Sequence, residues 1–219
     1  MCDLHFYHMP ADAMGTRRGK VVGHEPAGVV EEIGSCVTGV KPGDRVSVYH
    51  WISCGHCRYC RAGYRQFCKE RVGIAMYGYG SSAEYVLAPE ANCLPLPDEL
   101  SFADGAMMAC CAATAFSALK KLDVAGDDDL VVFGLGPVGL CTLVQAKALG
   151  ARVIGVEVVP ERLVLARALG ADDLIDAQDA DPVKGVRELT NGWGASAVVE
   201  TSGNTKARSQ VVEVLRPRG

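Results

Sequence analysis

Four cysteines stand close together in the first half of the chain, with spacing typical of a metal site. They are Cys54, Cys57, Cys60 and Cys68. Two-residue gaps let consecutive thiolates turn onto one ion, and a fourth sulfur closes a tetrahedron, as in structural zinc sites. In bacterial iron–sulfur proteins the last cysteine follows after three residues and precedes a proline; here it follows after seven and precedes a lysine. Disulfides or free thiols are the other alternative. The spacing favours a closed zinc site that stabilises the fold and does not catalyse.

A glycine-rich turn follows the apolar run Leu130–Phe133. It consists of Gly134, Leu135, Gly136, Pro137, Val138 and Gly139. In this G-x-G-x-x-G pattern the first glycine makes a tight turn, the second lets the backbone approach a pyrophosphate, and the third permits close helix packing. An ordinary glycine-rich turn is the alternative interpretation, but an acidic residue at the end of the next strand favours a dinucleotide site.

That acidic residue is Glu157, which stands 23 residues after Gly134. A carboxylate in this place accepts hydrogen bonds from the adenosine ribose and repels a 2′-phosphate, so the pattern favours NAD over NADP. Arg162 follows five residues later. Two interpretations of this arginine stay open: it lies over the adenine, or it is solvated.

The third motif, Gly23-His24-Glu25, contains a candidate for metal binding. One histidine in a loop is more often structural than a ligand until partners are found. Candidate partners are Cys110 or Cys111, and at the N-terminus Cys2, Asp3 and His5. Spacing alone does not bring them together.

Short β-type runs broken by Gly and Pro must position the histidine and the cysteines. The clearest are 28–33, 44–48 and 83–87, which predict a small barrel-like β domain. An Ala-rich helix is predicted over 102–122, with Ser101 as its N-cap and Asp104 at the third helical position.

After Gly126 strand and helix patterns alternate. Strands are predicted at 130–133, 152–157, 172–176 and 196–200, and helices near 137–149, 160–169, 182–190 and 204–215. This alternation is typical of a parallel sheet with crossover helices. The sequence therefore predicts a β domain at 1–122 and a partial doubly wound α/β domain at 123–219.

Composition excludes several classes of function. The chain has 219 residues and a formal charge of −4, which offers no basic surface for nucleic acid. The N-terminus lacks the apolar core of a signal peptide, and the longest uncharged run, 130–146, contains three glycines and a proline. We therefore expect a cytoplasmic protein with neither a nucleic-acid nor a membrane partner.

Taken together, these motifs resemble the zinc-dependent medium-chain dehydrogenase/reductase family, which includes alcohol, sorbitol and threonine dehydrogenases. The matching segments are Gly23-His24-Glu25, the four-cysteine group, Lys41–Arg45, Thr114–Leu119 and the glycine-rich turn. The resemblance spans the whole chain. It implies a GroES-like β-barrel domain that carries zinc and a Rossmann domain that binds NAD, with Thr114 among the cofactor-binding residues.

The resemblance also implies a second, catalytic zinc held by His24 and Cys110, with Glu25 beside the metal. Cys110 is favoured over Cys111 because it lies four residues before the threonine of the family's Thr-x-x-x-Ala-Leu segment. Asp3 matches an acid that supports the zinc-binding histidine, and His5 matches a histidine of the proton relay.

The family's first zinc ligand would fall just before Met1, and Cys2 stands where the relay hydroxyl is usual. Whether Cys2 replaces that ligand stays open. The resemblance also implies further strands at both ends, so we expect the chain to be an interior part of a longer enzyme.

The predicted activity is hydride transfer between NAD and an alcohol, polyol or amino alcohol, or the corresponding carbonyl compound, in a homo-oligomer. One alternative is an incomplete fragment that keeps only structural zinc and partial dinucleotide binding. The other is a zinc-free quinone reductase relative that uses NADPH, against which the four cysteines and Glu157 argue.

Overall fold

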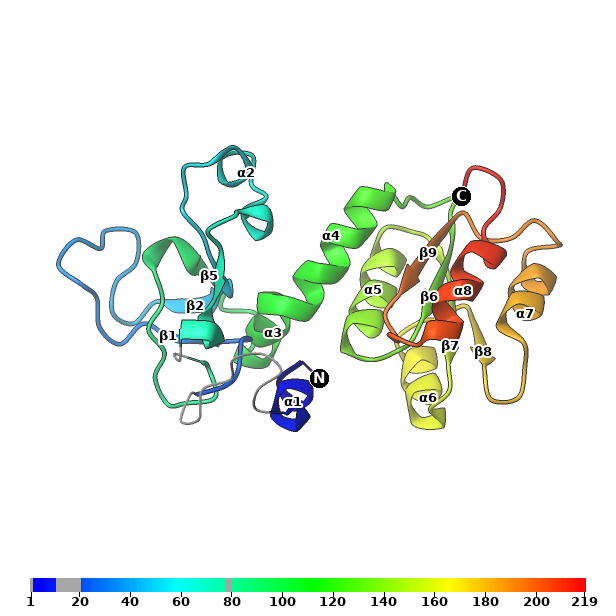
Figure 1. Ribbon diagram of the computed structural model, residues 1–219, viewed down its shortest axis with the longest axis horizontal. Helices are drawn as coiled ribbons and strands as arrows, with labels where there is room; N and C mark the ends of the chain where they lie inside the picture. The colour runs from blue at the N-terminus through cyan, green and yellow to red at the C-terminus, as the bar shows by residue number, and fades with distance from the viewer. Residues whose placement is uncertain (1, 11–20, 78–79) are drawn as a thin grey trace. The chain divides into compact units, whose positions relative to one another are not determined.

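The computed structural model describes residues 2–10, 21–77 and 80–219, which form two compact units, Met1–Cys110 and Cys111–Gly219. Figure 1 shows their elements in chain order. Each unit is considered by itself.

The strands of the first unit are short and antiparallel. β1 (Ala27–Val29), β2 (Arg45–Val48) and β5 (Cys93–Pro95) form one sheet, and β3 (Trp51–Ile52) pairs with β4 (Val72–Gly73). Val46, Val48 and Ile74 make the buried core of this unit, and Val30, Val86, Ala88 and Cys93 pack against it.

The helical segments of the first unit are short as well. They are α1 (Cys2–His8), α2 (Arg58–Arg61), η1 (Arg65–Phe67), η2 (Ile74–Tyr77), η3 (Glu90–Asn92) and α3 (Phe102–Met107). α3 begins at a capping box: Ser101 Oγ accepts from the Asp104 N–H, and the Asp104 carboxylate accepts from the Ser101 N–H. The predicted N-cap is therefore confirmed.

The predicted strand at 83–87 is wrong, and the one at 28–33 is too long. Residues 83–87 are irregular, and Tyr85 and Leu87 are 73% and 70% exposed. Alternating polarity stabilises a strand only where a neighbouring strand completes the hydrogen bonds, and the described residues provide no partner there. Backbone pairing of the other run ends at Val30, whose N–H donates to the Asp44 carbonyl oxygen, and residues 31–34 are exposed.

The second unit is a parallel sheet covered by helices on both faces. Its strands are β6 (Asp129–Phe133), β7 (Arg152–Glu157), β8 (Asp173–Asp176) and β9 (Ala197–Glu200), in the order β8-β7-β6-β9. Its helices are α4 (Ala113–Leu122), α5 (Pro137–Ala148), α6 (Pro160–Ala168), α7 (Pro182–Leu189) and α8 (Thr205–Val214). Every strand and helix predicted after Gly126 is confirmed to within two residues.

The central strand β6 shows how the two faces are filled. Leu130 and Val132 pack with residues of α4, α5 and α6, whereas Val131 and Phe133 pack with residues of α7 and α8. All four side chains are at most 2% exposed. Because β6 is buried on both faces, the glycine turn that follows it starts from a rigid position.

The stretch Phe102–Leu122 comprises α3, a π-helical turn (η4, Met108–Ala112) and α4. By length and composition it could cross a membrane, a test that core helices of soluble proteins also pass. The absence of a membrane partner stays a prediction.

Candidate metal sites and dinucleotide-binding turn

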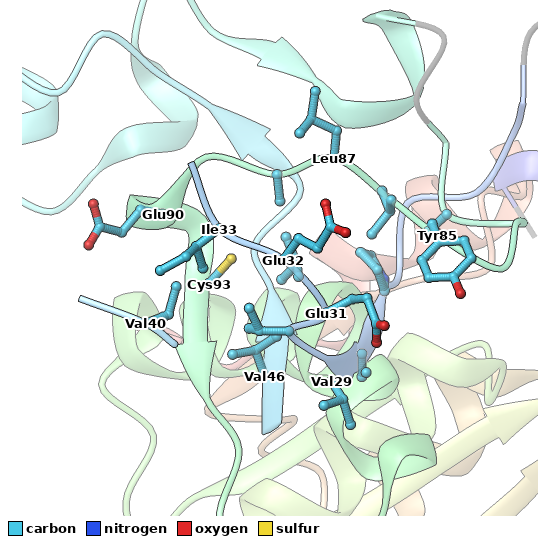
Figure 2. Close-up of a pocket in the computed structure, with 18 of the residues that line it drawn as sticks. Val29, Glu31, Glu32, Ile33, Val40, Val46, Tyr85, Leu87, Glu90 and Cys93 are labelled. Atoms are coloured by element: carbon cyan, nitrogen blue, oxygen red, sulfur yellow. The ribbon is translucent and has the colours of Figure 1, made fainter. Parts of the chain in front are cut away.

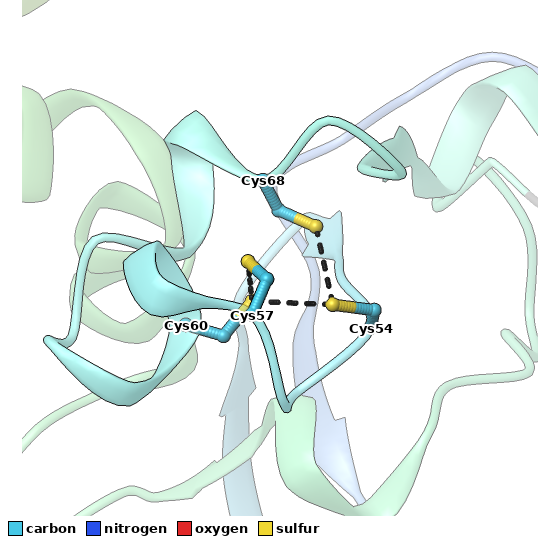
Figure 3. Close-up of side chains that lie close together, drawn as sticks. All are labelled: Cys54, Cys57, Cys60 and Cys68. Atoms are coloured by element: carbon cyan, nitrogen blue, oxygen red, sulfur yellow. Dashed lines mark hydrogen bonds between the residues drawn. The ribbon is translucent and has the colours of Figure 1, made fainter.

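The four predicted cysteines converge in the first unit (Figure 3). Their ligand atoms all lie within 4.8 Å of one another. The Sγ–Sγ distances are 3.5 Å for Cys57–Cys60, 3.6 Å for Cys54–Cys68 and 3.9 Å for Cys54–Cys60. A Zn–S bond of about 2.3 Å in a tetrahedron places sulfurs about 3.8 Å apart. The donor set therefore fits zinc, and no disulfide joins the described cysteines.

Short helical turns hold these thiols in place. Cys57 is the N-cap of α2, and Cys68 is the C-cap of η1. Arg65 of η1 ties the loop to the rest of the unit: its Nε donates to Ser53 Oγ at 2.9 Å and its Nη2 to Asn92 Oδ1 at 2.9 Å. The lobe is therefore braced before any ion binds.

The pKa values of two of the thiols, Cys57 and Cys60, are shifted in opposite directions. The Ser53 side chain, together with the Cys57 thiol, lowers the pKa of Cys60 to about 6. The backbone hydrogen bond from Cys60 acts to lower the pKa of Cys57, but desolvation and its bond to the Cys60 sulfur raise it to about 11. A thiolate, the form that binds metal, is thus favoured at Cys60.

A second cluster in the same unit contains His24, Glu25 and Cys110, whose ligand atoms lie within 4.8 Å of one another. His24 Nδ1 lies 2.9 Å from Asp3 Oδ2, and Asp3 Oδ1 accepts from the Gly23 N–H at 3.2 Å. A proton on Nδ1 donated to the carboxylate leaves Nε2 with its lone pair available for a metal. Nε2 lies 3.9 Å from Glu25 Oε1.

The backbone before His24 needs a glycine. Gly23 has a φ of +100°, and a Cβ there would lie 2.6 Å from the Ser82 nitrogen. The turn places His24 beside Asp3 and within reach of Cys110. The structure thus brings together three of the residues that sequence spacing left apart.

Two other predicted residues cannot be placed. The side chains of Cys2 and His5 lie outside the described part of the chain, so their roles stay predictions.

His50 is a neighbour of this cluster that sequence reasoning missed. Its ring centroid lies 5.4 Å from that of His24, and its Nδ1 lies 3.0 Å from the Ala109 carbonyl oxygen. Burial lowers the pKa of His50, which favours the neutral ring. The one available signal was weak: all five histidines lie in the first 56 residues.

The glycine-rich turn of the second unit has the geometry that its pattern predicts. Gly134 has a φ of +82°, and a Cβ there would lie 2.6 Å from the Ser202 nitrogen. A Cβ on Gly139 would overlap the Gly134 carbonyl oxygen. Gly136 is the N-cap of α5, no side chain caps that end, and no atom approaches within 4 Å of a Cβ built on Gly136. The open helix N-terminus with space above it suits a phosphate group.

Thr201, at the end of β9, braces the turn from the neighbouring strand and was also missed. Its Oγ1 lies 2.6 Å from the Gly134 carbonyl oxygen and 3.1 Å from the Phe133 carbonyl oxygen. The single hydroxyl proton can be donated to either of them. Threonine after a strand carries no pattern by which a sequence would single it out.

Comparison with known proteins matches both units of the chain to known families. Residues 1–98 match the family model described as alcohol dehydrogenase GroES-like domain, and residues 137–219 match that of zinc-binding dehydrogenase. The chain belongs to the zinc-dependent medium-chain dehydrogenase/reductase family. The predicted fold, a GroES-like domain followed by part of a Rossmann domain, is confirmed.

Relatives of this family member include several dehydrogenases. D-arabitol-phosphate dehydrogenase of Enterococcus avium is 39% identical over 91% of the chain and 57% of its own length. NAD-dependent alcohol dehydrogenase of Sulfurisphaera tokodaii is 36% identical over 94% of the chain and 60% of its own length. The solved alcohol dehydrogenase of Thermus sp. ATN1 has a TM-score of 0.89 and 33% identity, over 100% of this chain and 65% of that one. The chain thus spans less than two thirds of these relatives.

Glu157 is engaged by groups of the protein itself. Its Oε1 accepts from the Val158 and Val159 N–H groups at 2.7 and 3.2 Å, and its Oε2 accepts from the Leu135 N–H at 2.8 Å. Burial alone would raise its pKa, but these backbone donors, with Arg162, hold the pKa below its ordinary value. The carboxylate therefore fastens the end of β7 to the glycine turn.

We expect Glu157→Gln to lower the free energy of unfolding by about 1.5–3 kcal/mol at neutral pH, the range for hydrogen bonds to a charged group. Because the folded-state pKa is depressed, this stabilisation is present above the unfolded value of about 4.3 and disappears as the pH falls through the folded value. Urea unfolding at pH 7 and below pH 4 measures it, with the exposed Glu213→Gln as control. Equal stability of wild type and Glu157→Gln at neutral pH would contradict this role.

Arg162 and Thr114 are the other two residues predicted to bind the cofactor, and they lie in different surroundings. Arg162 Nη1 lies 3.4 Å from Glu157 Oε2, beside the glycine turn. Thr114 is exposed in the first turn of α4. Contact of either with a cofactor stays a prediction.

A groove of about 790 Å³ opens in the first unit between residues 25–34 and 81–90 (Figure 2). Its floor is apolar, with Val46, Val48 and Cys93, and Tyr85 and Leu87 stand at its rim. Of the second cluster, only Glu25 lines it. The groove is not the candidate site of chemistry.

Proposed function

We propose that this chain supplies the metal-binding and dinucleotide-binding parts of an enzyme that transfers hydride between an alcohol or polyol and NAD. The observation that carries the proposal is the cluster of His24, Glu25 and Cys110, three zinc-type donors from two distant parts of the sequence. The names of the relatives, which include alcohol, sorbitol and D-arabitol-phosphate dehydrogenases, support the substrate class.

The donors of this cluster fit a catalytic zinc. An imidazole nitrogen and a thiolate are strong ligands, and fewer than four firm protein ligands leave a position for substrate. Zinc held there would supply a Lewis acid that makes an alcohol easier to deprotonate near neutral pH. The chain's own contribution is orientation: Asp3 fixes the tautomer and the direction of the His24 ring, and Glu25 supplies a carboxylate beside it.

The glycine turn fits a dinucleotide for a similar reason. The N–H groups at the start of α5 are open to a pyrophosphate, and Gly136 leaves room for its approach. We infer that NAD is used in preference to NADP, because the carboxylate of Glu157 lies where a 2′-phosphate would add negative charge. The incomplete-fragment and quinone-reductase alternatives predict, respectively, no second zinc and a preference for NADPH.

We also propose a cytoplasmic location and a homo-oligomer. The homo-oligomer rests on the family resemblance, and the location rests on the clustering of the four cysteines, which is typical of metal-binding cytosolic proteins.

Binding and turnover with both cofactors test the proposal. We expect the zinc-loaded chain to bind NADH at least about tenfold more tightly than NADPH, measured by nicotinamide fluorescence. We expect alcohols or polyols to reduce NAD, followed by the absorbance of the reduced nicotinamide. Tighter binding of NADPH would contradict the role of Glu157, and reduction unaffected by removal of zinc would contradict the metal-dependent reaction.

A further inference from the structure

A third group of metal-type donors lies on the outer side of the four-cysteine lobe. One ligand atom each of Cys54, His56 and Glu70 lies within 4.8 Å of the others. Cys54 thus belongs to two clusters, because it also forms one corner of the four-cysteine group in Figure 3. A thiolate, an imidazole and a carboxylate are the three side-chain types that bind zinc in proteins.

The surroundings of His56 are those of a metal ligand. Its Nδ1 lies 2.9 Å from the Cys54 carbonyl oxygen, so a proton on Nδ1 is donated to the backbone and Nε2 keeps its lone pair. Metal-binding histidines usually have their second ring nitrogen engaged in this way. His56 is exposed, which leaves the ring accessible to an ion in solvent.

Glu70 supplies the oxygen donor of this group. Its side chain is exposed, and it has no hydrogen-bond or ion-pair partner among the residues that the structure describes. A carboxylate that no cation among the described residues neutralises is available to a hydrated divalent ion.

Access differs most between this outer group and Cys68, because Cys57 and Cys60 are half-buried like Cys54. Cys68 is 1% exposed, whereas Cys54 is half-buried and both His56 and Glu70 are exposed. Cys54 Sγ lies 3.6 Å from Cys68 Sγ and 3.9 Å from Cys60 Sγ. An ion held by Cys54 is therefore already beside the half-buried Cys60 and the buried Cys68.

We propose that Cys54, His56 and Glu70 form a zinc-entry site for the four-cysteine lobe. Zn²⁺ binds first at this outer site, with Cys54 as its sulfur ligand. Cys57, Cys60 and Cys68 then replace His56, Glu70 and the remaining waters, while Cys54 stays bound. Each sulfur that is still protonated releases its proton to solvent on binding, and no oxidation or reduction is involved. The inference rests on the proposed structural zinc site.

The rate of metal uptake tests this inference. The metal-free chain, in a Cys110→Ser background that removes the thiol of the second cluster, is mixed rapidly with Co²⁺. The sulfur-to-cobalt charge-transfer absorbance then reports filling of the four-cysteine site. We expect His56→Ala and Glu70→Gln each to slow uptake by about tenfold, with the final absorbance unchanged. The matched control is Glu99→Gln, another exposed carboxylate of the same unit, which should take up the ion at the unaltered rate.

Three outcomes separate the possibilities. An unaltered rate in either variant overturns the entry site. A reduced final absorbance in His56→Ala or Glu70→Gln overturns it as well, because the residue would then help to hold the bound ion. If the unsubstituted background itself gives no thiolate–cobalt absorbance, the structural zinc site on which the inference rests is wrong.

Discussion

Cys68→Ser should remove one zinc per chain and lower the free energy of unfolding of the first unit by more than about 4 kcal/mol, because a structural zinc contributes directly to folding. Cys68 is the most buried of the four thiols, at 1% exposed, and its sulfur lies 3.6 Å from that of Cys54. Without a fourth sulfur the tetrahedron stays open to water. The remaining three thiolates then repel one another around a weakly held ion.

Metal analysis and urea unfolding measure these two effects. A Trp193→Phe background leaves Trp51, in β3 beside the cysteine lobe, as the single tryptophan, so its fluorescence reports the first unit. The matched control is Cys36→Ser, the same substitution at an exposed cysteine outside the cluster, which should leave zinc content and stability unaltered. Unaltered zinc content in Cys68→Ser would show that the four cysteines do not share an ion.

Gly139→Ala should weaken NADH binding by about 100-fold or more, the scale of loss when binding groups are displaced by about 1 Å. A Cβ at this position would overlap the Gly134 carbonyl oxygen and lie 3.0 Å from Thr201 Oγ1. The methyl group must push α5 away from the end of β6. The open helix N-terminus then no longer faces the turn, and the unit is destabilised as well.

Gly136→Ala distinguishes a packing effect from a binding effect. No atom lies within 4 Å of a Cβ at Gly136, and its φ of −73° suits any residue, so this variant should unfold at the wild-type temperature. It should still bind NADH weakly, because the methyl group occupies the space that a pyrophosphate needs. Wild-type affinity in Gly136→Ala would mean that the dinucleotide does not approach the backbone here.

The second unit could be predicted almost completely from its sequence. Three of its four strands contain a continuous apolar run because helices cover both faces of the sheet, and each strand is followed by a helix with a clear start. The first unit was harder: its strands have two to four residues, and 83–87 has the alternation of a strand without the partner that would make it one.

The candidate sites also differ in how far the sequence predicts them. Spacing identified the four cysteines and the glycine turn because each is contained in one stretch of chain. His24 and Cys110 lie 86 positions apart in the sequence, so the family resemblance, and not the spacing, selected the pair that the fold brings together. His50 and Thr201 were missed because their contacts, with His24 and with the Gly134 carbonyl oxygen, form only in the folded chain. Glu157 was identified, but its backbone partners depend on the conformation of the turn.

The number of zinc atoms per chain, measured in the wild type and in two adjacent serine variants, tests the central claim most directly. The account predicts two in the wild type, one in Cys110→Ser and two in Cys111→Ser, whose buried thiol lies outside the cluster. It also predicts that reduction of NAD by an alcohol is lost only in Cys110→Ser. A single zinc in the wild type, or two in Cys110→Ser, would contradict a catalytic metal held by His24 and Cys110.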